Sequence, residues 1–107
     1  MQQIPELFFR LSTPDDDQDI RTLLSSANLP IADVRTWPQE YLLAMLDRRL
    51  VGCVGLERHG DDALLRSFAV APELRNRGLG SQLYDRIVVH AALRGVTAAF
   101  VLTTTAS

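Results

Sequence analysis

The chain has 107 residues, of which 47% are hydrophobic and 22% are charged, close to the usage of ordinary globular domains. This length allows one domain, or part of one, and no second, and the composition excludes a disordered tail or a collagen-like chain. Eleven basic residues, all of them arginine, face thirteen acidic ones, so the net charge of −2 argues against sequence-independent DNA binding.

Several further classes are excluded by what the sequence lacks. No apolar run approaches the roughly 18–20 residues that span a bilayer, and residues 1–10 do not have the pattern of a signal peptide. The single cysteine, Cys53, has no partner for an internal disulfide. We therefore expect a cytoplasmic protein with neither a membrane nor a nucleic-acid partner. Two histidines and one cysteine lie far apart, so their spacing predicts no metal site.

The N-terminal half begins with a strand and a helix. Residues 7–11 predict a strand, and residues 12–16 have the composition of a helix start, with Thr13 as its cap and Pro14 in the first helical position. Apolar residues then recur at helical spacing, at Ile20, Leu23, Leu24 and Ala27. Residues 28–30 are expected to end this helix, and residues 37–40 to open a short second one.

Three antiparallel strands are predicted next. Apolar runs over residues 41–46 and 50–56 flank a polar turn at 47–49. A second turn at 58–62 leads into a strand over residues 63–71.

A loop and a helix follow these strands. The segment Pro72–Leu74 breaks the last of them, and residues 75–80 form a glycine-bearing loop. The helix after the loop carries an apolar stripe of Leu79, Leu83, Ile87 and Ala91. Arg94 in its last turn and Gly95 just past it are typical of a helix end. Residues 96–103 predict a final strand.

The pattern Arg75-x-x-Gly78-x-Gly80, placed between a strand and a helix, indicates an anion site. Glycines let the backbone approach a ligand closely, and the first helical turn offers unpaired N–H groups suited to a pyrophosphate. The alternative is that the two glycines serve only a tight turn and close packing. A Rossmann dinucleotide site is excluded because it needs a glycine where Leu83 stands, and a parallel sheet.

These residues carry a resemblance to a known family. Residues 75–80, Arg-Asn-Arg-Gly-Leu-Gly, resemble the R/Q-x-x-G-x-G/A acyl-CoA signature of the GNAT N-acetyltransferases. The element order β-α-α-β-β-β-α-β is also similar, and the resemblance spans residues 7–105. It implies an α/β (α+β) fold with a GNAT acyl-CoA N-acyltransferase-like mixed sheet. Residues 51–57, 64–67 and 102–105 are similar to small-molecule acetyltransferases associated with arsenic-resistance operons.

The resemblance implies that acetyl-CoA is the cosubstrate and that a primary amine of a small molecule attacks the thioester directly. Backbone groups of Phe68, Ala69 and Val70 would pair with the pantetheine arm as an added strand does. The Val70 N–H would stabilise the oxyanion of the tetrahedral intermediate. The pyrophosphate would be held by the loop and helix start, that is by Arg75, Asn76, Arg77, Gly78, Leu79, Gly80 and Ser81.

Other residues have two interpretations each. Glu57 either takes the proton of the acceptor ammonium through water or is a solvated charge near a turn. Arg66 either binds a substrate carboxylate or is a surface arginine. Ser67 and Thr103 are candidate hydroxyls at the acceptor cleft. Cys53, in an apolar strand, is expected to be a buried and inert thiol rather than a nucleophile.

Members of this family continue past the last predicted strand with a fourth helix and two more strands, which often supply a tyrosine that protonates the departing thiolate. This sequence ends at Ser107. We therefore expect a single, truncated GNAT domain over residues 1–107, in which Tyr41 and Tyr84 do not match that tyrosine. The alternative function is a non-catalytic acyl-CoA-binding or dimerisation module. The exposed final strand predicts a homodimer.

Overall fold

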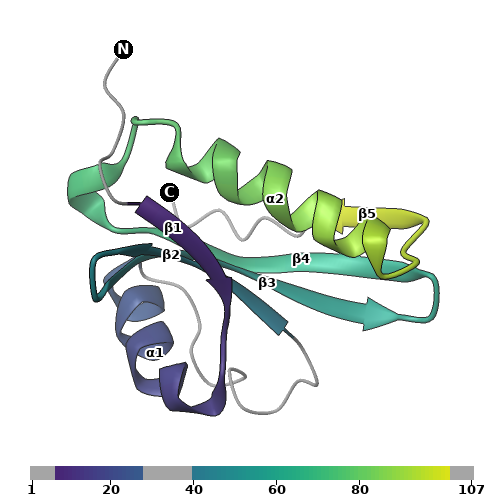
Figure 1. Cartoon of the computed structure of the whole chain (residues 1–107), viewed down its shortest axis with the longest axis horizontal. Helices are drawn as coiled ribbons and strands as arrows, with labels where there is room; N and C mark the ends of the chain where they lie inside the picture. Colours follow the sequence, from purple (N-terminus) through teal and green to yellow (C-terminus); the bar gives the residue numbers. More distant parts are fainter. Residues whose placement is uncertain (1–6, 28–39, 102–107) are drawn as a thin grey trace.

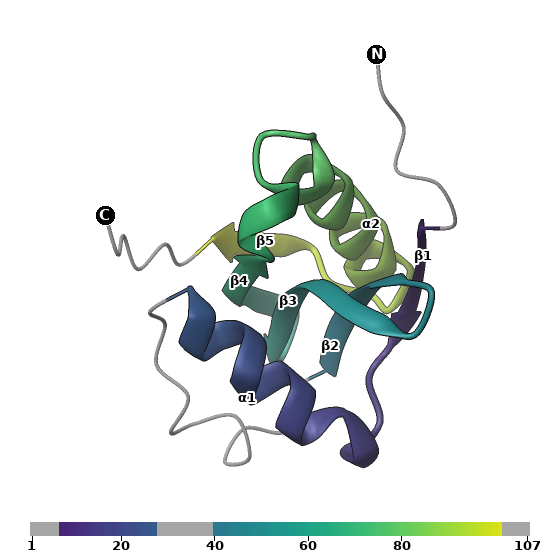
Figure 2. The same cartoon turned by 90° about the vertical axis from the view of Figure 1, so that its left-hand side faces the viewer.

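A mixed sheet with a helix on each face is the architecture of the computed structural model, which describes residues 7–27 and 40–101 (Figures 1 and 2). The strands lie side by side in the order β1-β2-β3-β4-β5. The elements in chain order are β1 Leu7–Leu11, a 3-10 turn Pro14–Asp16, α1 Asp17–Ser26, β2 Glu40–Leu46, β3 Arg49–His59, β4 Asp62–Val70, a 3-10 turn Pro72–Leu74, α2 Leu79–Leu93 and β5 Ala98–Val101. None of the helices described is long and apolar enough to cross a membrane.

The sheet has the predicted mixed character. Strands β1 to β4 pair antiparallel in succession, whereas β5 runs parallel to β4. The parallel pair arises because α2 connects β4 to β5 as a crossover, which brings the chain back to the same end of the sheet. The predicted α+β fold is confirmed.

Several predicted boundaries were wrong by a few residues. Glu40, which was predicted to belong to a second helix, is the first residue of β2 and pairs with Leu56. The rest of that predicted helix, with Trp37, lies outside the described residues. The hairpin turn expected over residues 58–62 is shorter, because Gly60 has a φ of 65° that closes it tightly and lets β3 extend to His59.

The ends of β4 and β5 also differ from the prediction. β4 ends at Val70, one residue early, because Pro72 begins a 3-10 turn. β5 begins at Ala98 rather than at residue 96, because the Thr97 N–H donates to the carbonyl of Asp61 at 2.8 Å and belongs to the connection. Thr103, which was predicted to be in this strand, lies outside the described residues.

The two helices enclose β3 and β4 from opposite faces (Figure 2). The predicted stripe of α2 is confirmed, since Leu79, Leu83, Ile87 and Ala91 are all buried. Each buried leucine or isoleucine contributes about 1.5–3 kcal/mol of transfer free energy. Residues 50–56 are apolar without alternation because β3 is covered on both faces; Val51, Cys53, Val54 and Leu56 all have exposed fractions of 1% or less.

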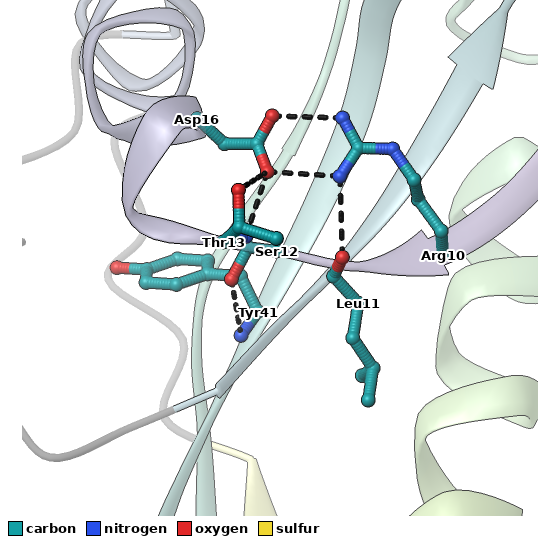
Figure 3. Close-up of polar contacts among 6 residues, drawn as sticks. All are labelled: Arg10, Leu11, Ser12, Thr13, Asp16 and Tyr41. Atoms are coloured by element: carbon teal, nitrogen blue, oxygen red, sulfur yellow. Dashed lines mark hydrogen bonds and ion pairs between the residues drawn. The ribbon is translucent and has the colours of Figure 1, made fainter.

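An ion pair fixes the corner between β1 and α1 (Figure 3). The Arg10 guanidinium donates to both carboxylate oxygens of Asp16, at 2.7 and 2.8 Å. Asp16 Oδ2 also accepts from the Thr13 N–H at 2.7 Å, so Thr13 is the N-cap residue, as predicted, and the carboxylate satisfies its amide. The hydrogen bonds from Arg10 outweigh the effect of burial and lower the pKa of Asp16 from 3.8 to about 2.

Asp16→Asn is expected to lower the free energy of unfolding at pH 7 by about 1–2 kcal/mol, less than the full pKa shift implies because Arg10 is 37% exposed. The folded-state pKa is depressed, so this contribution is present above pH 4 and is lost as the pH falls toward 2. Urea unfolding of the wild type and the variant at pH 7 and at pH 2.5 measures both effects.

Asp15→Asn is the matched control, because Asp15 lies in the same 3-10 turn and is exposed. It shares the favourable position at a helix start but not the contact with Arg10. An equal loss of stability in the two variants would contradict the role assigned to the Arg10–Asp16 pair.

Candidate functional site

The candidate site lies along the second half of β4, where the described strands pair with one edge only. Its pairing with β3 continues to Val70, opposite Gly52. Its described pairing with β5 covers only Asp62 to Leu65. Among the described strands, none pairs with the outer edge of β4 beyond Leu65, and this edge is the candidate place for a ligand.

Val70 presents its backbone to this open edge. The Ala71 N–H donates to the Val51 carbonyl at 2.8 Å, which directs residue 71 toward β3. Inward and outward residues alternate in an antiparallel ladder, so the N–H and C=O of Val70 point away from β3. By the same alternation Ala69, opposite Cys53, faces inward and Phe68 faces outward. The predicted segment of Phe68, Ala69 and Val70 therefore offers outward-pointing backbone groups at Phe68 and Val70.

A bulge interrupts β4 just before this segment. Gly55 pairs with Arg66 and Cys53 with Ala69, so β4 has one more residue than β3 over this stretch. Ser67 lies in the bulge with a φ of 56°, a left-handed conformation that is uncommon outside glycine. After the bulge the Phe68 ring lies beside the start of α2, where its Cε1 atom would be 3.8 Å from a Cβ placed on Gly80.

The loop after β4 leads into α2 through two residues with positive φ. Asn76 has a φ of 64° and Gly78, the N-cap of α2, a φ of 81°. Asparagine and glycine tolerate this conformation best. The shape of the loop therefore explains these two residues without any ligand. The first helical amide with an acceptor in the helix is that of Gln82, which donates to the Gly78 carbonyl at 3.1 Å.

The N-terminal end of α2 carries the partial positive charge of the helix dipole, and its first turn has no carboxylate to offset it. The N–H groups of Leu79, Gly80 and Ser81 precede the first intrahelical bond and point out of the helix end. The first turn of α2 contains no acidic residue, whereas the first turn of α1 contains Asp17 and Asp19. The partial charge of the α2 terminus is therefore left available to an anion.

Arginine side chains add charge beside this helix end. Arg75 and Arg77 are both exposed, and the Arg75 Nε–H donates to the Val70 carbonyl at 3.4 Å. Arg75 thus connects the loop to the open edge of β4. Nearby, Arg49 at the start of β3 pairs with Glu73 of the 3-10 turn. The structure brings the predicted cofactor residues together in one continuous region from Phe68 to Ser81.

Glu57 and Arg66 form a partly buried ion pair. Arg66 Nη1 lies 2.9 Å from Glu57 Oε1, and the two side chains are 24% and 14% exposed. They are diagonal neighbours on one face of the β3–β4 pair, since Glu57 lies opposite Leu64 and Arg66 opposite Gly55. The structure thus shows both side chains partly buried and paired with each other, which the sequence alone did not show because it does not give the strand register.

Cys53 is fully buried, as predicted. Burial raises the pKa of its thiol to about 12, against a weaker opposing effect of the Ala69 backbone N–H. The thiol is therefore protonated and cannot act as a nucleophile. Within residues 7–27 and 40–101 there is no group of three potential metal ligands.

The family model described as Acetyltransferase (GNAT) family matches residues 2–107 of the chain. No curated protein matches it by sequence. The match covers nearly all of the chain and includes every residue of the region described above.

Solved structures support the fold. The chain is similar to a GNAT family acetyltransferase from Brucella melitensis in complex with acetyl-CoA, with 17% identity, a TM-score of 0.79 and coverage of 94% of this chain and 77% of that one. The chain is also similar to the ribosomal-protein-S18-alanine N-acetyltransferase from Escherichia coli, with 15% identity, a TM-score of 0.80 and coverage of 94% of this chain and 70% of that one. A third similar structure is an aminoglycoside acetyltransferase from an uncultured soil metagenomic sample, with 21% identity, a TM-score of 0.70 and coverage of 94% of this chain and 81% of that one.

Proposed function

Because the chain belongs to the GNAT acetyltransferase family, we propose that it transfers the acetyl group of acetyl-CoA to the primary amine of a small molecule. One observation carries the proposal. The open edge of β4 at Val70 meets the carboxylate-free start of α2, and Arg75 connects the two. Acetyl-CoA has an extended amide-containing arm and a pyrophosphate, and these are the groups that such an edge and such a helix end bind.

Each part of the region has a role in holding acetyl-CoA. The outward backbone groups of Phe68 and the carbonyl of Val70 pair with the amides of the pantetheine arm, as in β-strand addition, and the Val70 N–H is left for the reacting acetyl group. The pyrophosphate lies at the N–H groups of the helix start, with Arg75 and Arg77 beside it. Gly80 leaves room for this approach, because a Cβ placed on it would have only the Phe68 ring within 4 Å outside its own helix turn.

Acetyl transfer begins when the thioester of acetyl-CoA is held in a fixed orientation beside the acceptor amine. The acceptor amine attacks the acetyl carbon, and a tetrahedral intermediate forms with its oxyanion at the Val70 N–H. Collapse of the intermediate breaks the C–S bond and releases the CoA thiolate, which takes a proton from solvent. Glu57 receives, through water, the proton that the amine loses. Holding both reactants in place supplies much of the rate enhancement.

The polar groups beside the reacting segment indicate the class of acceptor. The Glu57–Arg66 pair and Ser67 place charged and hydroxyl groups beside the reacting segment, which suits a small polar amine. The similarity of residues 51–57 and 64–67 to the acetyltransferases associated with arsenic-resistance operons points the same way. Of the similar structures, one is named for a small-molecule acceptor, an aminoglycoside, and another for a protein acceptor, the alanine of a ribosomal protein. A cytoplasmic location is supported by the one cysteine, which is buried.

The alternative is a domain that binds acyl-CoA without turnover. Calorimetric titration with acetyl-CoA, with ATP and NAD as controls, tests binding, and release of free CoA thiol in the presence of a panel of amines tests transfer. Selective binding with amine-dependent release supports the enzyme. Selective binding without release with any amine supports the binding module, and equal binding of ATP would contradict both.

Gly80→Glu is expected to weaken acetyl-CoA binding at least about tenfold, because it puts a negative charge beside the pyrophosphate. Gly80→Ala is the matched control, since its Cβ would lie 3.8 Å from the Phe68 ring, an ordinary contact. Calorimetry on both variants, after circular dichroism has shown that they are folded, makes the comparison. Unchanged affinity in Gly80→Glu would remove the helix start from the site.

Glu57→Gln is expected to lower kcat at least about tenfold and to leave the KM for acetyl-CoA within about twofold, because the amide cannot accept the amine proton. Glu40→Gln is the control, since Glu40 also contacts basic side chains, His90 and Arg94, but lies on β2. Steady-state kinetics at saturating amine measure the difference. Equal kcat in the two variants would leave Glu57 with only the ion pair to Arg66.

We also propose that two copies pair along β5. It is the last strand in the described order, so the edge of β5 opposite β4 carries backbone groups that none of the described strands pairs with. Light scattering coupled to size-exclusion chromatography is expected to give twice the 11.9 kDa mass of the chain. A monomer at every concentration up to the solubility limit would contradict this pairing.

A further inference from the structure

Gly52 of β3 lies under the first two turns of α2, a helix that packs mainly on this strand. The residue is buried, and a Cβ placed on it would lie 2.9 Å from Leu83 Cδ1 and 3.4 Å from Leu79 Cδ2. Carbon atoms that are not bonded to each other rest at about 3.5–4.0 Å. The start of α2 therefore lies closer to β3 than any residue with a side chain at position 52 would allow.

The sheet under these two turns is built of small residues. Ala44 of β2 pairs directly with Gly52, and its Cβ lies 3.4 Å from the position that a Cβ on Gly52 would take. Ala44 and Leu83 have no exposed surface, and Leu79 is only 1% exposed. Because a core packed this closely has no open space into which the Leu83 methyl could turn, an added methyl group at position 52 would lift the helical turn that carries Leu83.

The rest of α2 is held to the sheet by polar contacts. Glu40, the first residue of β2, has its Oε1 atom 3.1 Å from His90 Nε2 and its Oε2 atom 3.2 Å from Arg94 Nη1. Between the two ends of the helix, the Arg86 guanidinium lies over the Phe9 ring of β1, 4.1 Å from its centroid. These contacts hold the middle and the end of α2, so a lift under Leu83 would move mainly the start of the helix.

The depth of the helix start determines where the proposed pyrophosphate amides lie relative to β4. Leu79, which packs over Gly52, is also the first residue of α2 and supplies one of the N–H groups without an intrahelical partner. On the strand side, Gly52 pairs directly with Val70. Position 52 thus lies between the two parts of the candidate site, under the helix start and beside the proposed oxyanion donor.

We propose that Gly52 is a positioning residue for acetyl-CoA, because it lets the start of α2 pack close to β3 and so sets the distance from the pyrophosphate amides to the Val70 N–H. This inference rests on the proposed function. The pyrophosphate and the thioester belong to one molecule, so both bind at once only where this distance matches the extended arm between them. Gly52 has no side chain and acts through Leu79 and Leu83.

The test is the dissociation constant of acetyl-CoA for Gly52→Ala. It is expected to rise at least about tenfold, because misplacement of one part of a binding site by about an ångström has effects of this order. Ile87→Val is the matched control: Ile87 is fully buried in the same stripe of α2, one turn farther from the helix start. Its affinity is expected to stay within about twofold of the wild type, since a small cavity there does not move the helix start.

A double variant that conserves volume separates positioning from a loss of stability. Leu83→Val removes one carbon where Gly52→Ala adds one, so the helix is expected to regain its depth in Gly52→Ala/Leu83→Val. The double variant is expected to bind acetyl-CoA within about threefold of Leu83→Val alone. This comparison also decides the case in which Gly52→Ala by itself does not fold. Calorimetry on the full chain measures all variants after circular dichroism has shown that they are folded, and wild-type binding is established first.

The outcomes are distinct for each hypothesis. A wild type that does not bind acetyl-CoA overturns the proposed function. A wild type that binds, with Gly52→Ala equal to it, shows that the Leu83 side chain yields without moving the helix and overturns the positioning role alone. That role is also overturned if Gly52→Ala and Ile87→Val lose affinity equally, or if the double variant is unfolded or binds clearly more weakly than Leu83→Val.

Discussion

Incomplete pairing of β4 is the constraint on which the other features of the site depend. β4 bonds to β3 as far as Val70 but to β5, among described residues, only as far as Leu65. A sheet interior normally satisfies both edges of a strand, and an open edge is a place where another chain or ligand adds. The bulge at Ser67 lies two residues after Leu65, the last residue of β4 with a described partner in β5, and bulges bend a strand and increase its twist. The open edge, the bulge and the loop into α2 therefore follow one another within a few residues.

The charge around the start of α2 differs from the net charge of the chain. The total charge is −2, yet the start of α2 has no acidic residue and is flanked by Arg75 and Arg77. The start of α1 has the opposite composition, with aspartates that stabilise its own positive end and one, Asp16, that binds Arg10. The two helix starts therefore differ in charge: aspartates offset the partial positive charge of α1, and no acidic residue offsets that of α2, which suits the proposed pyrophosphate site.

The two faces of the sheet carry different chemistry. On the α2 face the helix start and the Phe68 ring flank the proposed cofactor arm. On the other face, Glu57 and Arg66 form their ion pair next to the bulge.

Local patterns in the sequence determined the helices, the strands and the glycine-bearing loop of residues 75–80. The stripe from Leu79 to Ala91 and the glycines of residues 75–80 are short-range signals, because helical spacing and positive φ depend on neighbouring residues. Tertiary structure alone decided the register of β3 against β4, which pairs Glu57 with Arg66, and the position of the bulge at Ser67. It also placed Glu40 in a strand and Cys53 beside the bulge. These features join residues far apart in the chain, and their energies come from packing between strands, which no local pattern records.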